Sequence, residues 1–181
     1  MYFKKMIGKK CYLSPIDIND AEKYVEWLND LEVTTNLGPI YYDMLNVENE
    51  KEIIKELSKK HNYSIVDMET DELIGNCSFL EIDNLNQTGE VGIFIGNKNF
   101  WGKGYGTEAL RLLLDFGFKV LNLHNIQLKV YEFNKRGMKC YEKTGFKVIG
   151  KRREALKRGN KAFDIIYMDI LYEEFCQTLP H

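Results

Sequence analysis

The sequence predicts an α+β fold, a mixed and mostly antiparallel sheet with helices on both faces in the element order βααβββαβαββ. Two observations support this prediction. Strand patterns at 63–68, 72–82 and 90–96 are joined only by short polar segments, so these strands should pair antiparallel. A helical pattern then separates the strand at 90–96 from a strand at 125–131, and such a crossover connection makes that pair parallel.

The N-terminal part of the chain supplies one strand and two helices. We expect a strand over 9–15, followed by a helix that Asp17 caps. Apolar residues at positions 21, 24, 25 and 28 have the spacing of one helical face. Gly38 and Pro39 indicate a loop over 36–45, and a second helix is predicted over 47–60.

The C-terminal part continues with two helices and three strands. The helix after a glycine-rich stretch should end near Leu121. Asn134 should cap a short helix that stops at Gly145, since glycine readily takes the left-handed conformation at a helix end. The last strands are predicted over 146–150 and 161–171, joined by a turn-rich segment at 152–160.

Composition indicates one globular domain spanning residues 1–181, with 44% hydrophobic and 29% charged residues. The net charge of −2 argues against nucleic acid as the main partner. No apolar run reaches the length of a membrane span, and no signal peptide is apparent. The four cysteines form no C-x-x-C pair and do not cluster with the histidines, so we expect no metal site, reduced thiols and a cytoplasmic protein.

The stretch NFWGKGYGTEAL at 99–110 places three glycines directly before a helix. The first N–H groups of a helix lack partners and lie at its positive end, and glycines let such groups converge on one anion. The glycines at 102, 104 and 106 fit neither the P-loop nor the dinucleotide fingerprint. We expect a pyrophosphate here, with Lys103 adding charge. The alternative is a tight turn in which the glycines serve only geometry.

Three motifs, in this order and spacing, resemble the GNAT N-acetyltransferase superfamily: GEVGIFIG at 89–96, FWGKGYGTEAL at 100–110 and NKRGMKCYEKTGF at 134–146. LSPIDINDAEKYVEWLND at 13–30 resembles the opening of its RimJ/RimL-type branch, which includes ribosomal-protein-alanine and spermidine N-acetyltransferases. The resemblance implies a GNAT-like fold, with acetyl-CoA as co-substrate and its pyrophosphate on the glycine loop. Trp101 departs from the Gln or Arg of the family pattern.

The resemblance also implies how acetyl-CoA is held. The strand at 91–96 would bind the pantetheine arm through its backbone, with a bulge that opens a slot beside the strand at 125–131. Asn134 would contact the cofactor near the pantetheine, unless it is only a helix cap. The complete implied cofactor set is Ile93, Phe94, Ile95, Trp101, Gly102, Lys103, Gly104, Tyr105, Gly106, Thr107, Asn134 and Tyr141.

Acetyl transfer to an amine also needs a proton donor and a proton acceptor. The resemblance makes Tyr141 the general acid, and its position two helical turns after Asn134 puts both on one helix face. The alternative role for Tyr141 is that of a core aromatic. Glu90 is the candidate base and Glu81 a second one, although a strand-end glutamate can equally be only solvated.

The predicted function is an N-acetyltransferase that moves an acetyl group from acetyl-CoA to a primary amine by direct attack in a ternary complex. The amine belongs to a peptide or protein N-terminus, or to a small cationic molecule such as spermidine. A non-catalytic acyl-CoA-binding module is the rival from another class, and a homodimer is left open. The residues expected to line the acceptor side are Trp27, Asp30, Glu32 and Tyr41, together with Asn29, Tyr42 and Asp43.

Overall fold

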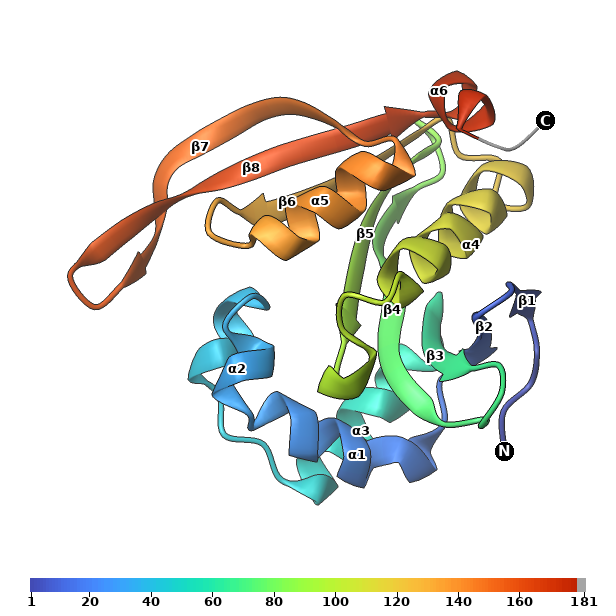
Figure 1. Ribbon diagram of the computed structural model, residues 1–181, viewed down its shortest axis with the longest axis vertical. Coiled ribbons are helices and arrows are strands. Elements are labelled where there is room, and N and C mark those ends of the chain that lie inside the picture. The colour runs from blue at the N-terminus through green and yellow to red at the C-terminus, as the bar shows by residue number, and fades with distance from the viewer. Residues whose placement is uncertain (179–181) are drawn as a thin grey trace. The chain divides into compact units, whose positions relative to one another are not determined.

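A computed structural model describes residues 1–178. Its eight strands are hydrogen-bonded in the order β1-β2-β3-β4-β5-β6-β8-β7 (Figure 1). They are β1 (Met6–Ile7), β2 (Cys11–Pro15), β3 (Asn62–Asp67), β4 (Leu73–Asp83), β5 (Thr88–Ile95), β6 (Asn125–Tyr131), β7 (Lys147–Arg158) and β8 (Lys161–Leu171). The mixed, mostly antiparallel α+β fold predicted from the sequence is confirmed.

Six α-helices accompany the strands. They are α1 (Ala21–Leu28), α2 (Leu31–Thr34), α3 (Val47–Leu57), α4 (Tyr105–Lys119), α5 (Lys135–Thr144) and α6 (Tyr172–Gln177). Short 3₁₀ segments lie at η1 (Ile18–Asp20), η2 (Gly38–Tyr42) and η3 (Lys98–Phe100). Among the helices of residues 1–178, none is long and apolar enough to cross a membrane.

The chain divides into two compact units. The first comprises residues 1–79 and 92–113, and the second comprises, of the described residues, 80–91 and 114–178. The division runs through β4, β5 and α4, so each of these elements contributes to both units.

In the first unit, β1, β2, β3 and β4 pair antiparallel in sequence order. Helix α1 packs against α3. Three of the four positions predicted for its apolar face, 21, 24 and 28, lie in the core of this unit, whereas Val25 is only partly buried. Trp27, which the predicted face did not include, is also buried in this core. It meets Tyr24 edge to face at 5.8 Å, and both contact the ring of Phe94 on β5. Helix α1 therefore packs against β5, the strand that is expected to hold the cofactor.

Strand β4 approaches the end of β5 unusually closely. A Cβ atom at Gly75 would lie 2.3 Å from the carbonyl oxygen of Phe94, so only glycine fits there. One residue earlier, the carbonyl of Ile74 accepts the N–H of Gly96 at 2.9 Å. The backbone of β4 thus fixes the C-terminal end of β5.

In the second unit, β6 lies between β5 and β8. The predicted parallel pair is confirmed: residues 88–90 of β5 pair with residues 125–127 of β6, and the ladder ends at Glu90 and Gln127. On its other side β6 pairs antiparallel with β8 along its whole length. Strands β7 and β8 form a long hairpin (Figure 1).

Several sequence-based boundaries were wrong. The turn-rich segment predicted at 152–160 is strand as far as Arg158, and only residues 159 and 160 form the turn. Pairing with β8 overrides the local turn signals, and irregularities between Val148 and Gly150 and between Arg152 and Leu156 take up the extra residues. The loop predicted at 36–45 contains η2, and β1, α2 and α6 were not predicted.

Candidate active site

The glycine-rich stretch is an open turn that leads into α4. Gly102 has φ +73° and Gly104 has φ +90°, values that disfavour any residue with a side chain. A Cβ at Gly102 would meet nothing within 4 Å, and one at Gly104 would meet only the Cε of Lys10 at 4.0 Å. The turn therefore presents bare backbone at the start of a helix of 15 residues, which fits a pyrophosphate.

Two side chains of this stretch hold it in place. The indole N–H of Trp101 donates to the carbonyl of Ile95 at 2.7 Å, and the hydroxyl of Tyr105 donates to Asp67 at 2.7 Å. The bond to Asp67 is the main cause that raises the pKa of Tyr105 to about 12. Trp101 and Tyr105, both predicted as cofactor residues, thus join the glycine loop to the ends of β5 and β3.

A second support comes from the turn between β1 and β2, which the sequence analysis missed. Glu108, in the first turn of α4, accepts the backbone N–H groups of Lys9, Lys10 and Cys11 at 3.0, 2.7 and 2.9 Å. Burial opposes ionisation of this carboxyl, but the three donors together hold its pKa below the usual value. The acid in the first helical turn was visible in the sequence, whereas its partners nearly 100 residues away were not.

Asn134 and Tyr141 lie on α5 in the second unit. The side chain of Asn134 accepts the N–H of Gly137 at 2.8 Å, so the predicted cap is confirmed. Gly145 ends the helix at φ +106°, and Phe146 packs edge to face on Tyr141 with ring centroids 6.1 Å apart. Burial raises the pKa of Tyr141 well above its ordinary value. The phenol therefore keeps its proton at neutral pH, as a general acid must.

Glu90, the candidate base, is also in the second unit and is engaged by two partners. Its carboxylate receives Lys129 Nζ at 3.0 Å and Gln127 Nε2 at 3.2 Å. The hydrogen bond to Glu90 is the main cause that raises the pKa of Lys129. Glu90 is therefore a fixed, ion-paired group at the last rung of the β5–β6 ladder rather than a freely solvated one.

The expected acceptor-side residues lie in the first unit. Trp27 is buried in the core. Asp30 and Glu32 both hold Lys98 Nζ, each at 2.6 Å, and Tyr41 packs edge to face on Tyr42. Two of the four residues thus already surround an ammonium group. These two carboxylates have the chemistry to bind a protonated amine.

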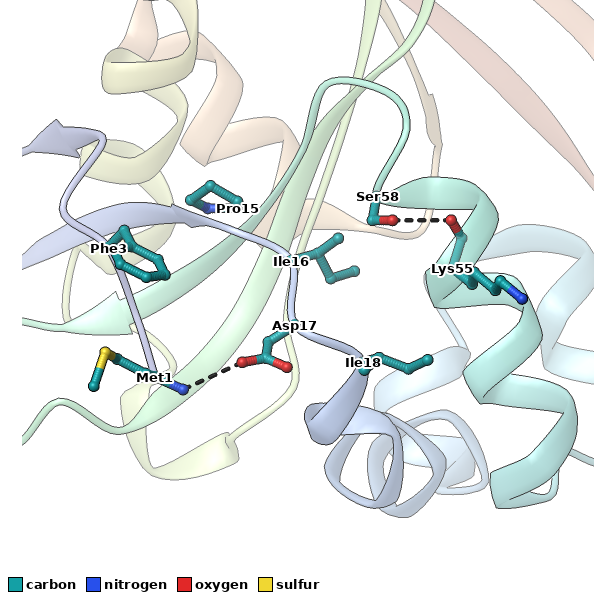
Figure 2. Close-up of a pocket in the computed structure, with 8 residues that line it drawn as sticks. All are labelled: Met1, Phe3, Pro15, Ile16, Asp17, Ile18, Lys55 and Ser58. Atoms are coloured by element: carbon teal, nitrogen blue, oxygen red, sulfur yellow. Dashed lines mark hydrogen bonds and ion pairs between the residues drawn. The ribbon is translucent and has the colours of Figure 1, made fainter.

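A cavity of 380 Å³ lies elsewhere in the first unit, beside β2 and α3. Figure 2 shows the terminal ammonium of Met1 directed at Asp17, and the hydroxyl of Ser58 directed at the carbonyl of Lys55. The lining is otherwise mainly apolar and includes none of the predicted site residues. The carboxylate in its lining, Asp17, is paired with the Met1 ammonium at 3.2 Å.

Comparison with known proteins decides the family. Residues 10–147 match the description "Acetyltransferase (GNAT) domain". The chain belongs to the GNAT acetyltransferase family. It is 33% identical over 168 residues to the uncharacterized N-acetyltransferase p20 of Bacillus licheniformis, covering 90% of this chain and 93% of that protein. This GNAT protein is thus an acetyl-CoA-dependent N-acetyltransferase.

Other proteins similar to this GNAT enzyme are named as spermidine acetyltransferases. The spermidine N(1)-acetyltransferase of Escherichia coli K12 is 28% identical over 140 residues, which cover 77% of this chain and 68% of that protein. The fold is similar to the spermidine N-acetyltransferase of Vibrio cholerae in complex with CoA and spermine, with TM-score 0.83 and 22% identity. That structural match covers 93% of this chain and 99% of the other.

Proposed function

We propose that this acetyltransferase acts on the primary amine of a small cationic molecule. The observation that carries the proposal is an excess of acid in the helical part of the first unit. Residues 20–56 contain ten acidic and only three basic side chains, and most of the acidic ones are exposed. Such a surface raises the local concentration of a cation.

Lys98 supports the same proposal because its ammonium imitates the expected ligand. Asp30 and Glu32 each contact it at 2.6 Å, and these hydrogen bonds raise the pKa of Lys98. Carboxylates in this arrangement stabilise the charged form of an amine. The similarity to spermidine acetyltransferases makes a polyamine the first acceptor to test.

The proposed reaction is direct attack of the acceptor nitrogen on the thioester carbonyl. The N–C bond forms, the C–S bond breaks, and acetyl-CoA supplies the acyl group. Tyr141 would give its phenolic proton to the departing sulfur. Glu90 would accept the proton that the amine loses, directly or through a water molecule. The glycine loop would hold the pyrophosphate, with Ile93, Phe94 and Ile95 along the pantetheine.

A competition experiment tests the acceptor. The enzyme is mixed with acetyl-CoA, spermidine and short peptides with free N-termini, and the acetylated species are identified by mass spectrometry. Acetylated spermidine supports the proposal. Acetylated peptides with unmodified spermidine would contradict it and indicate an N-terminal acetyltransferase.

Substitution of Tyr141 tests the catalytic assignment. Tyr141→Phe keeps the buried ring but lacks the acidic proton, so kcat should fall by about 10²-fold. Binding of CoA, measured by calorimetry, should remain. An unchanged kcat across the pH range would show that Tyr141 is only a core aromatic.

A further inference from the structure

We propose that Lys10 is a phosphate-binding residue for CoA, brought to the glycine loop by the turn between β1 and β2. The inference rests on the proposed cofactor site and adds a cation that lies outside the glycine-rich motif. It concerns the first unit alone, where Lys10 and the glycine loop both lie.

The side chain of Lys10 lies along the glycine loop. Its ammonium donates to the carbonyl of Lys103 at 3.0 Å and stands 5.8 Å from the centre of the Tyr105 ring. Its Cε is the atom that a Cβ at Gly104 would meet. An ammonium has three N–H donors, and the carbonyl of Lys103 takes one. The positive charge is therefore beside the bare backbone that fits an anion.

The backbone of Lys10 is fixed on both sides. Its N–H donates to Glu108 at 2.7 Å, and its carbonyl accepts the N–H of Met68 at 2.9 Å. A lysine on an anchored turn is placed before its ligand arrives, so less freedom is lost on binding. This anchoring separates Lys10 from an ordinary surface lysine.

Two carboxylates near the glycine loop, Glu108 and Asp67, are engaged by donors other than Lys10. Glu108 is occupied by three backbone N–H groups of the turn. Asp67 accepts the hydroxyl of Tyr105 and the backbone and side chain of Thr70. Both carboxylates thus accept hydrogen bonds from the segments around the glycine loop. The ammonium of Lys10 is left to face an anion from outside the chain.

The matched control is Lys4. It is also an exposed lysine of the first unit, it lies over a tyrosine ring (Tyr12, at 5.0 Å), and it has one weak hydrogen bond, to the sulfur of Met68. Lys4→Met and Lys10→Met therefore remove the same charge and similar contacts. They differ in that the ammonium of Lys10 donates to the carbonyl of Lys103 in the glycine loop, whereas that of Lys4 donates to Met68.

Calorimetric titration of both variants with CoA and with 3′-dephospho-CoA tests the inference. Lys10→Met should weaken CoA binding about three- to fivefold at low salt, and less at high salt, while Lys4→Met should match the wild type. Equal weakening for both ligands would assign Lys10 to the pyrophosphate. Weakening for CoA alone would assign it to the 3′-phosphate.

Two further outcomes would overturn the inference, and they are distinguishable. If the wild type binds CoA and both lysine variants bind it as tightly as the wild type, Lys10 has no role in binding and the proposed function stands. If the folded wild type binds neither ligand, the proposed cofactor site is wrong and the role of Lys10 fails with it.

Discussion

The indole N–H of Trp101 donates to the carbonyl oxygen of Ile95 at 2.7 Å, which ties the residue before the glycine loop to the last residue of β5. Trp101 occupies the position where the family pattern has Gln or Arg. The bond shows that this departure has a structural use, because one side chain joins the two segments expected to hold the pyrophosphate and the pantetheine.

Removing this bond should loosen the cofactor site. Trp101→Phe keeps an aromatic ring but leaves the carbonyl of Ile95 without its donor, so we expect a loss of about 1 kcal/mol of unfolding free energy. The KM for acetyl-CoA should rise severalfold while kcat changes less. Steady-state kinetics and urea denaturation measure these effects. A folded variant with an unchanged KM would show that the bond does not shape the site.

Glu50 should make the stability of the protein fall as the pH rises. It is buried on α3, its Oε2 has no hydrogen-bond partner within residues 1–178, and burial raises its pKa to about 7. The unfolded pKa lies near 4.3, so the folded state binds this proton more tightly. The free-energy cost of burying the ionised Glu50 carboxylate is absent below about pH 4. It grows as the pH rises and is complete above about pH 7.

Glu50→Gln removes this penalty without changing the shape of the side chain. The variant should be about 2 kcal/mol more stable than the wild type at pH 8 and nearly equal to it at pH 4.5. Chemical denaturation at the two pH values measures the difference. Glu52→Gln, an exposed glutamate on the same helix, is the control. The same pH dependence in both variants would contradict the burial argument.

Gly75 should be intolerant of any side chain because it touches the cofactor strand. A Cβ there would lie 2.3 Å from the carbonyl of Phe94, and backbone cannot move aside as a flexible side chain can. Gly75→Ala should cost about 2 kcal/mol or more and weaken CoA binding. Gly150→Ala, with nothing within 4 Å of its Cβ, is the matched control. Thermal melts of both variants with and without CoA measure the loss of stability and the stabilisation by CoA. Equal melting temperatures for the two variants would contradict the prediction.

The sequence predicted those features that depend on near neighbours. Asn134 caps α5 and Gly145 ends it because both roles are set by a few adjacent residues. The parallel pairing of β5 with β6 followed from the crossover helix between them, which the sequence pattern predicted. The contact of the Lys10 ammonium with the carbonyl of Lys103, 93 residues away, had no local signal. The full length of β7 was also missed, because pairing with β8 decides it rather than the residues of the segment itself.

Glu108 provides the test of how the first unit holds its glycine loop in place. One carboxylate accepts three backbone N–H groups of the turn at residues 9–11. Gln has one acceptor oxygen, and its amide donors would face those N–H groups. We therefore expect Glu108→Gln to lower the unfolding free energy by about 2 kcal/mol at pH 7. CoA binding should also weaken, since Lys10 belongs to the same turn.

The pH dependence of this effect has a definite sign. The hydrogen bonds hold the pKa of Glu108 below its usual value, so its stabilisation is complete above about pH 4.3 and is lost as the pH falls through the folded pKa. The wild type and Glu108→Gln should therefore converge in stability below pH 4. Glu22→Gln, an exposed acid in the first turn of α1, is the control and should differ little from the wild type at either pH. A stability gap that stays constant down to pH 3 would mean that the ionised carboxylate is not what fixes the turn.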